Sequence, residues 1–171
     1  MNPGSDMIER AGLIAAVDQA VDGIVITGVS GNIQYVNPAF TATTGYSAEE
    51  VVGQHTRILK SGRQSTAIYQ ELWATIQSGQ VWHGDLINRR KDGSIYTEEL
   101  RITPVKALNG EIVNYIAIKE DVTERRAAEA DQQFLAAIVQ SSEDAIISFS
   151  REGTILTWNR GAESILGYSA E

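Results

Sequence analysis

The sequence predicts an α+β fold in which a five-stranded antiparallel sheet carries short helices on one face and has flanking helices at both ends. Short apolar runs of strand length occur first as a pair and later as a set of three, with helical spacing between the two groups. Asp92-Gly93 and Asn109-Gly110 separate the last three runs, and such dipeptides are strong hairpin signals. Antiparallel strands with the helices on one side form an α+β layer.

The elements can be predicted in order along the chain. A flanking helix is expected over residues 1–21, because Leu13, Ile14 and Val17 recur at helical spacing and Gly23 then ends the pattern. The elements expected after it are strands at 24–27 and 33–36, short helical pieces between 37 and 58, a longer helix at 65–77, strands at 81–90, 94–105 and 111–120, and a helix that Asp121 and Thr123 cap and that runs to about residue 140. A complete domain is therefore expected at 22–121, followed by a connector helix at 122–141.

The sequence then begins again. The pentapeptide GYSAE of residues 45–49 recurs at 167–171, and Asn37 recurs as Asn159, both at an offset of 122 residues. A fixed offset across several positions indicates a tandem repeat. Residues 142–171 are thus expected to be the first part of a second copy that lacks counterparts of the last three strands, and an output domain of the parent protein is expected to follow.

Composition excludes several classes of function. The net charge is −8 and the pI about 4.8, so a nucleic-acid partner is not expected. The chain has no cysteine, which excludes disulfides, thiolate metal sites and cysteine nucleophiles. No apolar run reaches the roughly 18 residues needed to span a bilayer and no signal peptide opens the chain, so a cytoplasmic location without direct membrane contact is expected.

The sequence carries no pattern of an active site. There is no nucleophile–base pair, no phosphate-binding loop and no pair of carboxylates suited to shared acid–base chemistry, since Glu98 and Glu99 are neighbours on a strand and point to opposite faces. His55 and His83 stand apart from each other and from any carboxylate cluster, so no metal site is expected. We therefore expect neither enzymatic activity nor catalytic residues.

Three segments resemble the PAS sensory domain family. They are DGIVITGVSGNIQYVNPAFTATTGYSAEEVVGQ, NRRKDGSIYTEELRITPV and IAIKEDVTERR, and the resemblance covers about residues 13–126 and again 134–171. Within the family, RILKSG, NRRKDG and the pair Trp73 and Trp82 are similar to the flavin-binding redox-sensor branch, which includes nitrogen-fixation and methane-oxidation regulators. The resemblance implies a PAS fold and the input module of a bacterial-type signalling protein, such as a two-component system, that binds FAD, senses redox or oxygen state and relays it through the C-terminal helix.

Strand alternation independently selects residues that face the interior. Tyr96, Glu98, Leu100 and Ile102 share a face, and because three of the four are apolar or aromatic, that face is the core side and Glu98 points inward. Comparison with flavin-binding PAS domains implies that this residue faces the ligand together with an amide and an ammonium on the neighbouring strands, Asn88 and Lys119. Such groups suit the polar edge of a flavin ring and are costly to bury without a partner.

Three further residues are candidates for cofactor binding through the resemblance. Thr56 falls where light-sensing flavin PAS domains carry a reactive cysteine, so that photochemistry is excluded here. Arg57 is expected either to reach a phosphate of a bound dinucleotide or to be solvated. Trp82 is expected either to stack on a ring or to pack in the core.

Several alternatives remain at this stage. Glu98 and Lys119 could pair across the interior with Asn88 bonded beside them and leave no ligand site, which would make the domain a ligand-free element for dimerisation and signal relay. An enzyme with flavin chemistry is a third, weaker reading. Haem is not expected, because Trp73 occupies the position of the ligating histidine in haem PAS domains. A homodimer is expected through the flanking helices and the outer sheet face, where aliphatic side chains gather.

Overall fold

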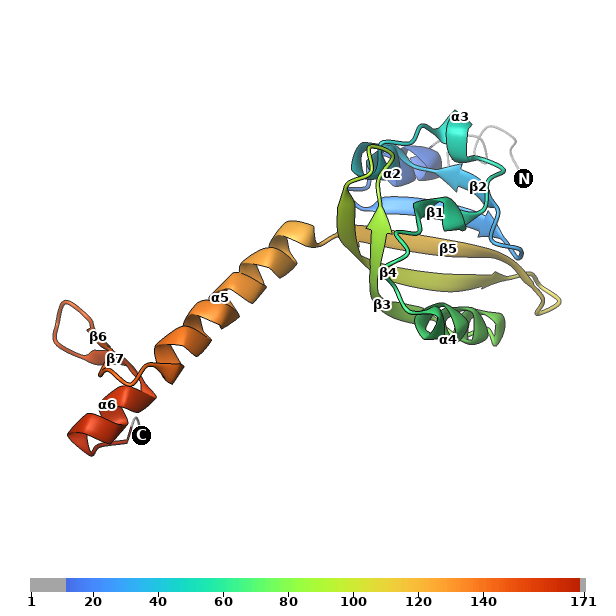
Figure 1. Ribbon diagram of the computed structural model, residues 1–171. Helices are drawn as coiled ribbons and strands as arrows, with labels where there is room; N and C mark the ends of the chain where they lie inside the picture. Colours follow the sequence, from blue (N-terminus) through green and yellow to red (C-terminus); the bar gives the residue numbers. More distant parts are fainter. Residues whose placement is uncertain (1–11, 170–171) are drawn as a thin grey trace. The chain divides into compact units, whose positions relative to one another are not determined.

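The computed structural model describes residues 12–169 and divides the chain into two compact units, one that ends at Thr123 and one that starts at Glu124 (Figure 1). Residues 12–18 are helical, whereas the first eleven residues of the expected N-terminal helix lie outside the described part of the chain. The same holds for residues 170–171, the last two of the repeated pentapeptide. Each unit is described by itself.

The first unit contains a five-stranded antiparallel sheet in the order β2-β1-β5-β4-β3. The predicted α+β fold class is confirmed, and the predicted strands differ from the observed ones by at most one residue at either end. The strands are β1 (Gly23–Gly28), β2 (Ile33–Val36), β3 (Trp82–Arg89), β4 (Ile95–Lys106) and β5 (Ile112–Asp121). The chain crosses from β2 to β3 through a set of helices, and β5 then returns to the centre beside β1.

The crossover consists of α2 (Pro38–Thr44), α3 (Ala48–Val51), the 3₁₀ helix η1 (Thr56–Leu59) and α4 (Thr66–Gln77). Their shortness follows from the sequence. Gly45 ends α2 with a left-handed φ of 76°, and the backbone N–H of Ser47 donates to the Glu50 carboxylate at the start of α3 (2.9 Å). Short, separately capped helices leave room between them and the sheet, which a single long helix would fill.

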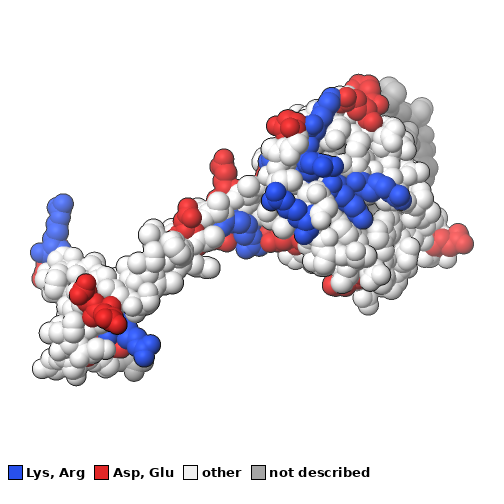
Figure 2. Space-filling model, in the orientation of Figure 1, with Lys and Arg blue, Asp and Glu red and all other residues white. Residues whose placement is uncertain are grey.

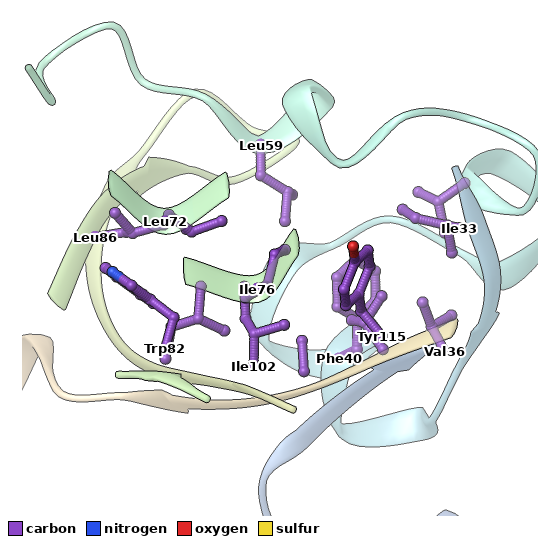
Figure 3. Packing of buried hydrophobic residues seen from close by; sticks show 14 residues of the cluster. Ile33, Val36, Phe40, Leu59, Leu72, Ile76, Trp82, Leu86, Ile102 and Tyr115 are labelled. Atoms are coloured by element: carbon purple, nitrogen blue, oxygen red, sulfur yellow. The ribbon is translucent and has the colours of Figure 1, made fainter. Parts of the chain in front are cut away.

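The hydrophobic core lies between these helices and the inner face of the sheet (Figure 3). Strand alternation holds along β4, where Tyr96, Glu98, Leu100 and Ile102 are all buried. The same inner face of the sheet continues on β3 and β5. Its buried side chains on those two strands are Trp82, Leu86, Asn88, Tyr115 and Ala117.

Asn37 ties three parts of the first unit together. Its side-chain oxygen accepts hydrogen bonds from the backbone N–H groups of Ile24 (2.8 Å) and Phe40 (3.1 Å). Its Nδ2 donates to the carbonyls of Asp22 (2.9 Å) and Val17 (3.2 Å). One buried amide therefore caps α2, fixes the start of β1 and holds the helical residues 12–18.

The second unit repeats this arrangement. Asn159 accepts from the backbone N–H groups of Ile146 (2.8 Å) and Ala162 (2.9 Å) and donates to the carbonyls of Val139 (2.8 Å) and Asp144 (2.9 Å). Each partner lies 122 positions after its counterpart in the first unit, so the sequence repeat is also a repeat of hydrogen bonding. The elements are α5 (Thr123–Ser141), β6 (Ile147–Phe149), β7 (Ile155–Trp158) and α6 (Arg160–Leu166).

The substitution Asn37→Ala is expected to lower the free energy of unfolding of the first unit by about 2–4 kcal/mol, because it leaves two donors and two acceptors without their partner. Asn37→Asp is expected to be intermediate, since its carboxylate can still accept from Ile24 and Phe40 but cannot donate to the two carbonyls. Urea unfolding followed by circular dichroism measures both. Asn109→Ala, at an exposed turn, is the control, and a loss as small as that of the control would contradict the role of Asn37.

Candidate functional site

A cavity of about 260 Å³ lies in the first unit between η1, α4 and the inner face of β3, β4 and β5. Its walls are largely apolar and come from both layers of the fold. The apolar wall residues are Val25, Leu72, Ile76, Leu86, Leu100, Ile102 and Ala117. Ligand pockets for drug-sized molecules are typically about 300–1,000 Å³, so this cavity can enclose a ring system but not a whole dinucleotide.

A polar cluster around Glu98 forms part of the wall. Its Oε1 accepts from the Lys119 ammonium (2.5 Å) and from Asn88 Nδ2 (2.9 Å), and its Oε2 accepts from the Tyr96 hydroxyl (3.0 Å). Glu98 is 1% exposed, and the Lys119 side chain is 10% exposed. An ionised carboxylate at this depth is tolerated only when it is paired and hydrogen-bonded, and here both conditions are met.

The strand register explains why these groups meet. Leu86 on β3 and Asp121 on β5 lie opposite Glu98, and Lys119 lies opposite Leu100. Asn88 and Lys119 are therefore diagonal neighbours of Glu98 on the same face, within reach of long side chains. The three strands thus bring an amide, a carboxylate and an ammonium to one place.

Tyr96 supplies a neutral donor to this cluster. Burial, followed by the negative charge of Glu98, raises the pKa of Tyr96 far above its usual value. The phenol therefore keeps its proton at physiological pH and donates to the carboxylate. On its other side, the Arg90 guanidinium lies 4.5 Å from the centre of the Tyr96 ring, in a cation–π arrangement.

The exposed part of the lining is basic. Of the residues that line the cavity, Arg57 and Lys60 are the two classed as exposed, and both belong to the segment around η1. Lysine and arginine side chains also gather on the face of the first unit drawn in Figure 2. In a chain with a net charge of −8, a basic entrance favours an anionic group on whatever enters.

An aromatic wall closes another side. Trp73 meets Tyr115 edge to face, with ring centroids 6.1 Å apart, and lies 6.2 Å from the His55 ring. A Cβ added to Gly31, which has a φ of +80°, would come within 2.9 Å of the Trp73 ring, so the turn needs glycine. Burial, with the charges of Arg57 and Lys60, lowers the pKa of His55, and its Nδ1 accepts from the Arg57 N–H (3.1 Å).

Five of the six predicted cofactor-binding residues line this cavity: Thr56, Arg57, Asn88, Glu98 and Lys119. The sixth, Trp82, is 5% exposed, is not among the lining residues and packs in the core, with its indole against Gly84 (Figure 3). Alternation places Trp82 on the inner face correctly but says nothing about where along the strand the cavity lies. The ligand role of these residues stays a prediction.

Sequence reasoning missed Lys60 and Tyr69 as lining residues. Tyr69 falls in the apolar stripe of α4, where its hydroxyl is indistinguishable from the polar tip of an ordinary core tyrosine. Lys60 follows η1 in a loop, and loop positions carry no periodicity from which a direction can be predicted. His83 lies outside the cavity, where its Nε2 bonds to the Glu99 carboxylate (3.0 Å).

The arrangement suits a planar heteroaromatic ring with a polar edge. Apolar side chains can cover the faces of the ring, while Asn88 and Lys119 offer hydrogen bonds to one edge. Within residues 12–169, no group of three or more metal-ligating side chains is found. No helix in that range is both long and apolar enough to cross a membrane.

Comparisons with known proteins identify the family of the chain. Residues 21–124 match the family described as PAS domain, and residues 133–171 match the family described as PAS fold. The nitrogen fixation regulatory protein of Klebsiella oxytoca is 42% identical over 107 residues, which cover 63% of this chain and 22% of that protein. The chain thus spans about a fifth of the length of this relative.

Two solved structures share the fold. One is an RNA-binding light-oxygen-voltage receptor, with a TM-score of 0.70, 28% identity and coverage of 77% of this chain and 38% of that one. The other is a light-oxygen-voltage domain studied with a flavin analogue, with a TM-score of 0.61, 26% identity and coverage of 74% of this chain and 96% of that one.

We expect Lys119→Met to lower the free energy of unfolding by about 3–5 kcal/mol, because it leaves the Glu98 carboxylate buried without its cation. Adding Glu98→Gln to that variant is expected to recover much of the loss. Chemical denaturation of the wild type, the single variants and the double variant measures the free energies of unfolding for this double-mutant cycle.

The matched control for this cycle is Lys91→Met, which breaks the Lys91–Glu50 pair. That pair has the same 2.5 Å separation but side chains that are 49% and 43% exposed. Its loss is expected to be much smaller, since exposed pairs contribute little. Equal losses for the two lysine variants would show that burial of the Glu98 pair has no energetic role.

Proposed function

The chain belongs to the PAS domain family, and from that premise we propose that its first unit is a sensory input module that binds a flavin, as FAD, in the cavity beside Glu98. The module would sense redox or oxygen state and relay it through α5 to an output domain of a cytoplasmic signalling protein, as in two-component systems. We assign it no catalytic step.

One observation carries the proposal. The ligand-free alternative requires the Glu98–Lys119 pair and Asn88 to fill the interior. The pair does form, at 2.5 Å, and Asn88 is bonded to the same carboxylate oxygen. A cavity of about 260 Å³ nevertheless remains beside them. The polar cluster is therefore a wall of a cavity, which is what a binding site requires and a closed core does not.

The residues fit the two chemically different parts of FAD. The isoalloxazine ring is planar, and its edge carries carbonyl oxygens, ring nitrogens and an N–H. Asn88 can pair with such an edge, and Lys119 carries three N–H groups, of which one reaches Glu98. A bound flavin would supply reversible electron transfer, while these side chains orient the ring and exclude water from it.

The phosphate groups of FAD would lie toward the entrance. Because the cavity is too small for the whole dinucleotide, the rest of the molecule must extend outward past Arg57 and Lys60. Both side chains are cationic and exposed, as a pyrophosphate requires. Thr56 lies beside them on η1, and in a chain without cysteine no thiol adduct with the ring can form.

A connected set of contacts leads from the cavity to the first residue of α5. The Tyr96 hydroxyl bonds to Glu98, and the Tyr96 ring lies against Arg90. Arg90 pairs with the Asp121 carboxylate, which in turn accepts from the backbone N–H (3.0 Å) and hydroxyl (2.6 Å) of Thr123. Changes at the Glu98 carboxylate would thereby reach the start of the output helix.

The comparisons support the flavin through the light-oxygen-voltage domain that was studied with a flavin analogue, and support a regulatory role through the nitrogen fixation regulator. The second candidate function is a ligand-free element for dimerisation and relay. It is favoured by apolar side chains on the outer sheet face, where Ile118 is 42% exposed, and by Leu13 at 68% on the flanking helix. The two functions can coexist in one domain.

The direct test of ligand binding is a visible absorption spectrum of the purified protein after incubation with FAD and gel filtration. We expect a yellow protein whose spectrum shows the bands of oxidised flavin, with dithionite bleaching them reversibly. A colourless protein under these conditions would overturn the flavin proposal and leave the ligand-free element.

Asn88→Ala is expected to weaken FAD retention by about fivefold or more, because it removes a hydrogen bond to the ring edge that is worth about 1 kcal/mol or more. The control is Asn114→Ala, which removes an amide on the outer side of β5 that bonds to Gln34 (2.7 Å). Equal retention by the Asn88 variant and the wild type would contradict the placement of the ring.

Substitutions on β5 test whether the protein forms a dimer through the outer face of the sheet. Ile118 and Val113 are 42% and 44% exposed, and alternation points them to opposite faces of the sheet. Static light scattering at tens of micromolar is expected to show a dimer for the wild type and for Val113→Lys, and a monomer for Ile118→Lys. A wild-type monomer would exclude the dimer at this concentration.

A further inference from the structure

The α4 residue Tyr69 lines the cavity, and its hydroxyl group has no hydrogen-bond partner among residues 12–169. The Tyr69 oxygen is shielded from solvent. Among the described residues, the Trp82 indole N–H is the other shielded side-chain group without a partner, but Trp82 does not line the cavity. Tyr69 is therefore the described residue that combines a shielded, unpaired polar group with a position at the cavity.

An unpartnered buried hydroxyl is unfavourable, and the large majority of buried polar side-chain atoms in folded proteins are paired. Burial raises the pKa of Tyr69, and the negative charge of Glu98 raises it further. The phenol consequently stays protonated and acts as a donor. A donor that is kept protonated and dry beside a cavity is suited to an acceptor that arrives with a ligand.

We infer that Tyr69 is a ligand-binding residue whose hydroxyl donates a hydrogen bond to an acceptor atom of the bound heterocycle, a carbonyl oxygen or an unprotonated ring nitrogen. The inference rests on the proposed function, since it concerns the same cavity. This hydrogen bond would make binding selective, because a ring without an acceptor at this position leaves the Tyr69 hydroxyl unpaired and binds more weakly.

The Tyr69 ring is held in place before any ligand binds. The Lys60 ammonium lies 3.7 Å from the ring centroid, in a cation–π contact. Lys60 itself is fixed by a backbone β-bridge to Asn88. The Tyr69 ring is thus held beside the cavity before binding, so little conformational entropy is lost when a ligand enters.

The test compares Tyr69→Phe with Tyr46→Phe. Tyr46 also has a lysine above its ring, with Lys91 Nζ 6.0 Å from the centroid, but it does not line the cavity. FAD is titrated into each apo-protein, and quenching of flavin fluorescence gives the Kd. We expect Tyr69→Phe to raise the Kd about fivefold to tenfold, as one lost hydrogen bond does, and Tyr46→Phe to leave it within about twofold.

Thermal unfolding of the apo-proteins supplies an independent readout. Removing an unpaired hydroxyl is expected to raise the melting temperature of Tyr69→Phe by about 2 °C or more, while the wild type keeps the higher FAD affinity. A merely structural tyrosine would not show these opposite changes. If Tyr69→Phe fails to fold, or melts below the wild type, the hydroxyl is paired in solution and the inference is wrong.

The outcomes separate this inference from the proposed function. If the wild type binds no FAD, the proposed function fails and this inference fails with it. If the wild type binds FAD and Tyr69→Phe binds it within about twofold, the flavin site stands and the role of Tyr69 alone is overturned.

Discussion

The hydrogen bonds and the ion pair of the buried Glu98 carboxylate hold the interior of the first unit together. It accepts from Lys119, Asn88 and Tyr96, and its side chain is 1% exposed. Since β3, β4 and β5 each contribute at least one member, the cluster joins three adjacent strands on their inner face. Removing Lys119 would leave the carboxylate without its cation, and removing the Tyr96 hydroxyl would leave Oε2 without its donor, in both cases at low dielectric. The same cluster gives the cavity its polar edge, so the groups that stabilise the interior are also those that the proposed flavin would meet.

The open side of the cavity is held by a second set of contacts, along the edge of β3. The Gln64 side chain accepts from the Ile87 N–H (3.2 Å) and donates to the Asp85 carbonyl (3.4 Å), and the Ser61 hydroxyl bonds to the Ile87 carbonyl. This segment pairs with an edge strand that would otherwise present unpaired backbone groups. It also fixes Lys60 at the entrance, which explains how a loop can supply a positioned cation.

Much of this could be predicted from the sequence because alternation along a strand is a strong constraint. Glu98 had to face the core once its neighbours at 96, 100 and 102 did, whereas Asn88 and Lys119 were placed beside it by the resemblance to flavin-binding PAS domains. The repeat was visible in the sequence at Asn37 and Asn159, and these two buried amides make the same set of four hydrogen bonds. Position along a strand is not encoded in alternation, so the sequence allowed Trp82 either to stack on a ring or to pack in the core, and the structure places its side chain in the core. Tyr69 belongs to the apolar stripe of α4. The spacing of such a stripe predicts which face of the helix is buried, but it does not predict whether one hydroxyl group finds a hydrogen-bond partner.

If the Glu98 cluster forms the wall of a flavin site, a crystal structure of the protein saturated with FAD will show it. We expect ring density between α4 and the strands β3, β4 and β5. Asn88 and Lys119 should lie within hydrogen-bond distance of the polar edge of the ring, with the Glu98–Lys119 pair still formed. A cavity that remains empty under saturating FAD, or a ring bound elsewhere on the protein, would contradict this expectation.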